Sequence, residues 1–307
     1  MKKGDTLRST NPSNNDNFEP PSKILLIGCR NIAPANGYSL LNRRISAEVV
    51  LLGDGSEHLR NEILKLDAAV PTGHASKLRV GGIEDITDAN VCVLASGVVP
   101  SRNATADQSI LLNIDVIRRE AQLLRQHEFN GVLVVTTSPV DVMAQVAMET
   151  TGLASSKVIG LESSADAEPK ALSSSIWCTA AGSGAEYMDS CQPDCPHFED
   201  VLKITCYHSS TSHRGVIANC VLRICEAIVR DEKAVMPVEA LLNGEYGIIG
   251  TFVTVPCVIG RQGIEQIVEF PVSHDERSRL LDAARDNFRR YQRITKRSQK
   301  AKHAVTT

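Results

Sequence analysis

The feature that most constrains the fold of this chain is the alternation of short aliphatic runs with longer amphipathic stretches. The runs are mostly apolar and rich in β-branched side chains, and they cover residues 23–28, 48–53, 90–95, 131–136 and 158–160. Helix-like segments such as 107–126 lie between them. Apolar strands separated by helices are typical of a parallel sheet that helices cover on both faces. The pattern therefore predicts an α/β fold with a doubly wound parallel sheet.

Beyond residue 170 the order of elements changes. Strand-like segments at 177–181 and 251–259 flank a helical stretch at 216–232, and a charged helix is expected at 274–292. This mixed order predicts an α+β second domain. Both ends of the chain are polar, with few residues to bury, as in flexible tails. The predicted units are a disordered tail, the doubly wound domain, the α+β domain and a basic tail, with boundaries 1–22, 23–160, 161–292 and 293–307.

Charge and hydropathy exclude two classes of partner. The formal net charge of -3 gives no global basic field for nucleic acid or anionic lipid. The apolar runs are shorter than the roughly 20 residues that a membrane helix needs. No apolar stretch precedes Lys23, so a secretory signal is not expected and the predicted location is cytoplasmic. The nine cysteines are mostly in apolar segments and are expected to be reduced, buried thiols.

A series of landmarks between Lys23 and Ala284 resembles the L-lactate/malate dehydrogenases. Their order and spacing carry the resemblance, and the final stretch is closer to lactate than to malate dehydrogenases. They are the segments 23–28, 88–91 before Ser96-Gly97, 137–141, 158–160 before Ala165-Asp166, 244–247 and 255–260. The resemblance implies a Rossmann-type doubly wound parallel sheet, followed by the α+β C-terminal domain of that family. It also implies a homodimer or homotetramer. An unrelated doubly wound domain is the alternative.

The cofactor site that the resemblance implies is degenerate here. In the family, a glycine-rich turn after the first strand lets the backbone approach the NAD pyrophosphate, and an acid after the second strand holds the ribose. Arg30 replaces the second glycine of that turn, and Gly53 replaces the acid. Arg30 is expected to obstruct the dinucleotide, although a guanidinium also suits phosphate. The expected vestigial contacts are Gly28, Ile32, Asp54, Gly97 and Ser138, with NAD affinity weak or absent.

Most of the family's catalytic side chains are also missing. Oxidation of lactate needs a His to take the proton, an Asp to orient that His, and two Arg for the carboxylate and the carbonyl. By spacing, Asp166 remains where the Asp belongs, while Gly184 stands at the His position. Pro169 and Ala106 stand at the two Arg positions. Asp166 is then interpreted as a structural remnant rather than a catalyst.

Three functional hypotheses follow from these substitutions. The favoured one is a pseudoenzyme with a scaffolding or regulatory role, no required cofactor, and a protein partner that the sequence does not identify. The alternative is a divergent NAD-dependent L-lactate dehydrogenase-type oxidoreductase or a sensor of NAD or another ligand. The third is a domain that binds a different small molecule in the vacated cleft.

A group of cysteines and histidines offers the ligand types of a zinc site. Cys191, Cys195 and His197, followed by Cys206 and His208, supply ligands of the right type. Their spacing follows no well-known zinc pattern. A remodelled surface loop with free thiols is the favoured interpretation, and no metal site is predicted.

Overall fold

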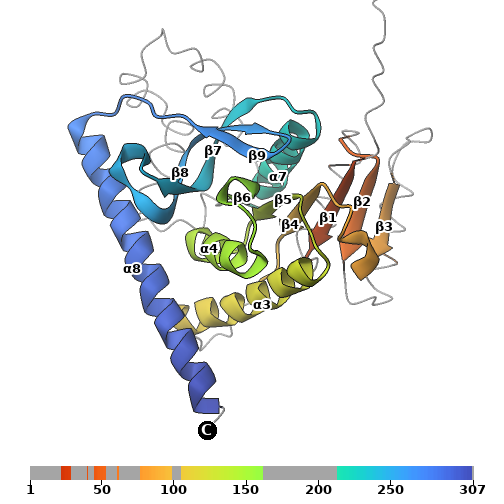
Figure 1. Ribbon diagram of the computed structural model, residues 1–307, viewed down its shortest axis with the longest axis horizontal. Helices are drawn as coiled ribbons and strands as arrows, with labels where there is room; N and C mark the ends of the chain where they lie inside the picture. Colours follow the sequence, from red (N-terminus) through yellow and green to blue (C-terminus); the bar gives the residue numbers. More distant parts are fainter. Residues whose placement is uncertain are drawn as a thin grey trace, which may run out of the picture.

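The computed structural model describes residues 22–28, 40, 45–52, 61, 77–98, 105–161 and 213–305. Within them lies one nine-stranded sheet in the order β3-β2-β1-β4-β5-β6-β7-β8-β9. Figure 1 shows the helices packed around this sheet. The strands are β1 (Lys23–Ile27), β2 (Glu48–Leu52), β3 (Lys77–Gly81), β4 (Val91–Leu94), β5 (Val132–Val135), β6 (Val158–Gly160), β7 (Ala234–Asn243), β8 (Ile249–Gly260) and β9 (Gly263–Ile267).

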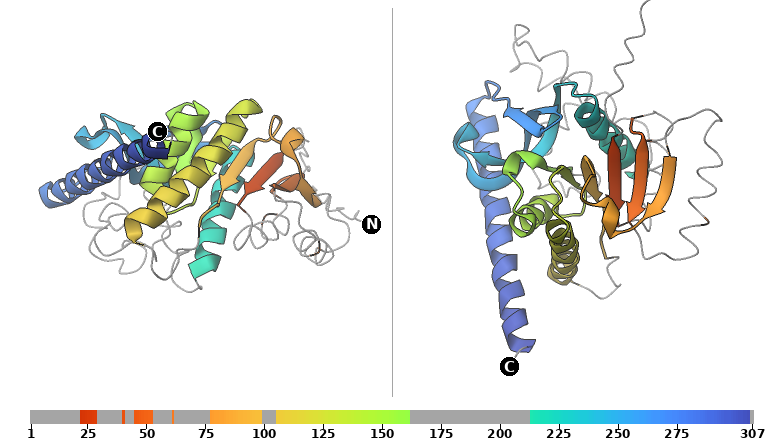
Figure 2. Two further views of the ribbon diagram at one scale, coloured as in Figure 1. Left: turned by 90° about the horizontal axis from the view of Figure 1, so that it is seen from below. Right: turned by 45° about the vertical axis from the view of Figure 1, so that its right-hand side comes forward.

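Strands β1 to β6 are parallel, and β1 lies between β2 and β4. Apart from the edge strand β3, these strands are mostly apolar on both faces because helices cover both faces, as in other parallel sheets. Alternate side chains enter two separate core clusters. Leu25 and Ile27 pack with helices α3 (Ala106–Gln126) and α4 (Val140–Thr151), whereas Ile24 and Leu26 pack with α7 (His213–Val229). Figure 2 shows α3 and α4 on one side of the sheet and α7 on the other.

The strands of the predicted second domain extend this same sheet. β7 joins β6 in the antiparallel direction, with Gly160 opposite Glu239, and β8 and β9 continue the antiparallel part. Gly160 allows the close approach, because a Cβ there would lie 2.7 Å from Val140 Cγ1 and 2.8 Å from Glu239 Cβ. Short 3-10 helices occur at Ile83–Asp85, Ser155–Lys157 and Glu245–Gly247.

Helix α3 begins where its sequence predicts. Thr105 forms a capping box: its hydroxyl accepts from the Gln108 amide at 3.2 Å, and the Gln108 side chain accepts from the Thr105 amide at 2.9 Å. Ala106 is therefore the first helical residue. Helix α4 starts after a cis Ser138–Pro139 peptide and ends at Gly152, which has a φ of 77°.

Helix α8 (His274–Val305) corrects the prediction of a basic tail from residue 293. It continues well past 292 and crosses α4 and α3 (Figure 1). Ile294 is fully buried, and Arg293 and Arg297 both pair with Asp107 in the first turn of α3. Arg290 lies 3.4 Å from Asp141 in the first turn of α4. Residues 293–305 are therefore helical, and at least Arg293, Ile294 and Arg297 contact the body of the protein.

The other sequence predictions for secondary structure divide into three groups. The predicted strands at 23–28, 48–53, 90–95, 131–136 and 158–160 correspond to β1, β2, β4, β5 and β6, and 251–259 corresponds to β8. Strands β3, β7 and β9 were not predicted from the sequence. The segment 177–181 lies outside the described residues. Within the described part of the chain, no helix is both long and apolar enough to cross a membrane.

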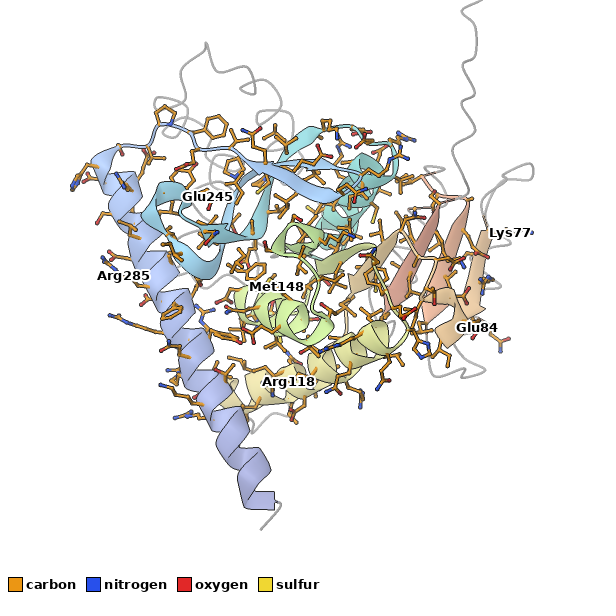
Figure 3. The ribbon with its side chains drawn as sticks, in the orientation of Figure 1. Lys77, Glu84, Arg118, Met148, Glu245 and Arg285 are labelled. Atoms are coloured by element: carbon orange, nitrogen blue, oxygen red, sulfur yellow. The ribbon has the colours of Figure 1, made fainter. Side chains whose placement is uncertain are left out.

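Charged side chains lie on the outside of this fold. Lys77 on β3 and Arg285 on α8 point away from the body of the protein (Figure 3). Arg285 pairs with Asp282 one turn earlier, at 3.0 Å. Such exposed pairs add little to the free energy of unfolding. The outer face of α8 around Arg285 is therefore solvated, as predicted for this charged helix.

Candidate functional site

The candidate site lies at the carboxyl ends of β1 and β4. The strand order reverses here, because β2 and β3 lie on one side of β1 while β4, β5 and β6 lie on the other. Doubly wound sheets bind ligands outside the carboxyl ends of their strands at such a switch point. We call the residues gathered there the switch-point site: they are Gly28, Ser96, Gly97, Asn113, Glu120, Thr137 and Ser138.

Gly28 ends β1 in a conformation that only glycine adopts easily. Its φ is 94°, and a Cβ on it would lie 2.2 Å from the backbone nitrogen of Ser96. The Ala95 amide donates to the Ile27 carbonyl at 2.9 Å, which brings the segment after β4 against the end of β1. The glycine that persists in the degenerate turn is therefore required by packing within the chain, whether or not a ligand binds.

Asn113 on α3 connects the segments that follow β4 and β5. Its side-chain oxygen accepts from the Val98 amide at 2.8 Å, and its side-chain nitrogen donates to the Ser138 carbonyl at 3.0 Å. The Thr137 hydroxyl donates to the Ser96 carbonyl at 2.5 Å. Three predicted positions, Gly28, Gly97 and Ser138, thus lie at one edge of the sheet, held together by groups from both loops.

Glu120, in the C-terminal half of α3, brings a carboxyl to the same site. The Ser96 hydroxyl donates to Glu120 Oε1 at 2.6 Å. Within the described residues, the second oxygen, Oε2, is buried without a hydrogen-bond partner. Burial raises the pKa of Glu120, and the Ser96 hydrogen bond and the charge of Arg119 oppose that rise only in part. A carboxyl with a raised pKa and an unpartnered oxygen is typical of functional sites.

A buried acid, Asp141, lies in the first turn of α4, three residues after Ser138. Its side chain is 7% exposed, and burial raises its pKa against the opposing charge of Arg290. One of its oxygens also has no hydrogen-bond partner among the described residues. Asp141 belongs to the persistent segment 137–141, and its pairing with α8 makes it a structural acid rather than part of the switch-point site.

The sequence analysis found some of these residues and missed one. Gly28, Gly97 and Ser138 were predicted and are brought together, whereas Glu120 was not singled out. A signal existed, because Glu120 follows buried Ile117 by three positions and precedes buried Leu124 by four. An acid beside the apolar stripe of a helix is unusual. Ala106, which the resemblance places at the Arg of a mobile loop, is the first residue of α3.

Several predicted site residues lie outside the described residues. They are Ile32, Asp54, Asp166, Pro169 and Gly184, together with Arg30, Gly53, Cys191, Cys195 and His197. Among the residues that the structure does describe, no group of three potential metal ligands occurs. Cys92, Cys225 and Cys257 are buried free thiols, and burial raises the pKa of Cys225 to about 12. That placement agrees with the prediction of reduced, buried cysteines.

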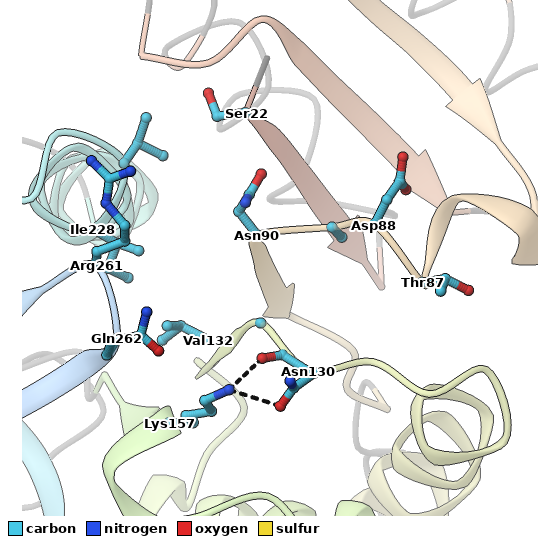
Figure 4. A pocket seen from close by; sticks show the side chains of 13 residues that line it. Ser22, Thr87, Asp88, Asn90, Asn130, Val132, Lys157, Ile228, Arg261 and Gln262 are labelled. Carbon is cyan, nitrogen blue, oxygen red and sulfur yellow. Dashed lines mark hydrogen bonds between the residues drawn. The ribbon is translucent and has the colours of Figure 1, made fainter. Parts of the chain in front are cut away.

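A cavity of about 310 Å³ lies at the opposite, amino edge of the sheet (Figure 4). Its wall includes Asp88, Asn130, Lys157 and Arg261. The Lys157 ammonium donates to the Asn130 carbonyl at 2.6 Å and to the side-chain oxygen at 2.7 Å. Lys157 therefore binds a carbonyl just beyond the C-terminus of α3, where a cation is favourable. Doubly wound folds bind ligands at the other edge, so this cavity is not the candidate site.

Comparison with known families supports the resemblance found in the sequence. Residues 22–160 match the lactate/malate dehydrogenase, NAD binding domain, and residues 208–289 match the lactate/malate dehydrogenase, alpha/beta C-terminal domain. The L-lactate dehydrogenase of Priestia megaterium is 25% identical over 87% of this chain and 95% of its own length. The L-lactate dehydrogenase 1 of Staphylococcus aureus strain JH9 is 26% identical over 86% of this chain and 94% of its own length.

Solved structures give the same fold. A lactate dehydrogenase from a Medee basin deep-sea metagenome library superposes with a TM-score of 0.70 at 20% identity, covering 90% of this chain and 99% of that one. The Cryptosporidium parvum lactate dehydrogenase, complexed with lactic acid and β-nicotinamide adenine dinucleotide, gives 0.71 at 18% identity with the same coverage. At these identities the likeness establishes the architecture alone.

Proposed function

This chain belongs to the lactate/malate dehydrogenase family, and we propose that it is a member without ordinary dehydrogenase activity that has a scaffolding or regulatory role. Its Rossmann-type sheet and C-terminal domain are those of the family. The relatives are named as lactate dehydrogenases, but this chain departs from the family pattern at the reacting positions. We therefore propose that the fold is kept while catalysis is lost.

The substitutions at the catalytic positions carry the proposal. Gly184 stands where the proton-transferring His belongs, and Pro169 and Ala106 stand where the two Arg belong. Loss of a positioned general base alone lowers the rate by about 10²–10⁴. Each lost charge-assisted hydrogen bond removes roughly 1.5–3 kcal/mol. These groups act as a unit, so Asp166 without its His retains no proton-transfer role.

The switch-point site does not fit the dinucleotide that the family implies. Gly97 leaves the backbone open to close approach, since no described neighbour lies closer than 3.6 Å to a Cβ placed on it, whereas Ser96 already packs against Gly28. Against this, Arg30 and Gly53 replace family residues of the phosphate and ribose sites. The Glu120 carboxyl also lies at the end of the sheet where phosphates rest in doubly wound folds. We therefore propose that NAD is not a required cofactor.

One observation favours the alternative of a divergent NAD-dependent L-lactate dehydrogenase-type enzyme or an NAD sensor. Residues 22–160, which contain the six parallel strands, still match the family's NAD binding domain. On this alternative, Arg30 pairs with a phosphate of the dinucleotide. A site that takes a different small ligand is the third candidate.

Calorimetric titration with NAD and with NADH separates these functions. The scaffolding or regulatory proposal predicts no saturable heat with either nucleotide at concentrations up to the millimolar range. Stoichiometric binding of either would refute it and support the enzyme or sensor. Binding without turnover would single out the sensor.

The scaffolding role also requires assembly. We propose a homodimer or homotetramer in the cytoplasm, without nucleic-acid or membrane partners, because closed symmetric oligomers are the rule for such soluble chains. Light scattering at micromolar concentration should give at least twice the mass of one chain. A monomeric mass would remove the scaffolding argument.

A further inference from the structure

The misfit between the family's dinucleotide and the switch-point site points to one residue in the described structure. We propose that Glu120 sets the ligand specificity of this site by excluding ligands that carry a pyrophosphate. This inference rests on the proposed function, and it adds a determinant to Arg30 and Gly53. It concerns charge at the site rather than the shape of the glycine-rich turn.

The position of Glu120 is fixed on both sides. Its neighbours on the helix, Ile117 and Leu124, are fully buried in the core cluster between α3 and the sheet. Its carboxyl accepts from the Ser96 hydroxyl at 2.6 Å, and Ser96 in turn lies against Gly28. A single hydrogen bond therefore joins the Glu120 carboxyl to Ser96, the residue that packs against Gly28 at the end of β1. In a doubly wound fold this is the place at which a pyrophosphate approaches the backbone.

An ionised Glu120 carboxyl opposes an anionic ligand there, because like charges repel. Two unit charges about 10 Å apart, at an effective dielectric constant of about 20, repel each other enough to lower affinity by roughly ten- to twentyfold. A bound anion would also favour the protonated carboxyl, so that binding is coupled to proton uptake. Among the described residues, only the Ser96 hydroxyl donates to this carboxyl and only the charge of Arg119 favours its ionised form, while Oε2 is buried without a hydrogen-bond partner there.

A purely structural role is the competing explanation. Glu120 would then serve only to hold Ser96 in place beside Gly28. The two explanations differ for Glu120→Gln, which keeps the side-chain length and the oxygen that accepts from Ser96 but removes the charge. A structural role predicts no gain of nucleotide binding in this variant, whereas exclusion by charge predicts a gain.

The experiment is a fluorescence titration with NADH of the parent chain, Glu120→Gln and the control Glu149→Gln. Glu149 is also a helical glutamate that accepts from a hydroxyl, that of Tyr291, but it lies in the last turn of α4. We expect NADH affinity to rise about tenfold or more in Glu120→Gln and to stay at the parent value in Glu149→Gln. Glu120→Leu, which extends the apolar stripe of α3, is the second variant and should show the same gain.

Adenosine supplies the matching ligand control. It has no phosphate, so its affinity measured by calorimetry should not differ between the parent and Glu120→Gln. Equal NADH affinity in the parent and both folded Glu120 variants would overturn the inference, as would an equal gain for adenosine. The parent's own affinity for NADH tests the proposed function, whereas the ratio between variant and parent tests Glu120, so the two can fail separately.

Discussion

The C-terminal half of α8 allows a prediction that follows directly from packing. Ile294 is fully buried in the core cluster that contains Ile114 and Ile117 of α3 and Val142 of α4. Replacing a fully buried Ile by Ala removes its transfer free energy and leaves a cavity, at a cost of about 2–5 kcal/mol. We therefore expect Ile294→Ala to lower the free energy of unfolding by about 3 kcal/mol in a urea denaturation experiment.

The control for Ile294→Ala lies half a turn further along the same helix. Lys296 is exposed, so Lys296→Ala should change the free energy of unfolding by no more than about 0.5 kcal/mol. A loss in Ile294→Ala no larger than that in Lys296→Ala would refute the packing of this segment. It would restore the earlier expectation of a solvated tail beyond residue 292.

Three further predictions test the edges of the sheet and the cofactor turn. Asp85 accepts from Arg79 and Lys23, and those hydrogen bonds hold its pKa well below the usual range. The contribution of ionised Asp85 to the free energy of unfolding should be complete above pH about 4 and should be lost as the pH falls through its lowered folded-state pKa. Asp85→Asn should lower the free energy of unfolding by about 2–4 kcal/mol in chemical denaturation. Gly28→Ala should lower the free energy of unfolding by about 3 kcal/mol or more in the same assay. The φ of 94° disfavours a side chain, and a Cβ would lie 2.2 Å from the Ser96 backbone nitrogen. An unchanged free energy of unfolding would contradict the geometry of the switch point. The double variant Arg30→Gly, Gly53→Asp should bind NADH more tightly than the parent in a fluorescence titration, and no gain would mean that the glycine-rich turn is wrongly aligned.

Sequence patterns predicted the apolar parallel strands and missed β3, whose polar side chains pair with residues outside the strand. β1, β4 and β5 are almost uniformly apolar, so their segments alone identify them. β3 contains Lys77 and Arg79, and its polar composition makes sense only beside Glu48 and Asp85, to which Arg79 binds. The sequence of residues 77–81 alone does not indicate those partners.

The same reason explains the errors at α8 and at the candidate site. The basic composition after residue 292 resembles a tail until Arg293 and Arg297 are seen to pair with Asp107, a residue almost two hundred positions away. At the switch-point site, Gly28, Gly97 and Ser138 followed from the family resemblance. Glu120 stands out in the sequence as an acid within the apolar stripe of α3, but its hydrogen bond with Ser96, which places it at the site, is visible only in the fold.

The most direct test of the central claim is a steady-state assay of NADH oxidation by the purified chain with pyruvate and with oxaloacetate. Pro169, Gly184 and Ala106 at the reacting positions predict no rate above background with either substrate. Turnover near that of a normal dehydrogenase, at about 1–10³ s⁻¹, would contradict the account and show that other residues perform the proton transfer.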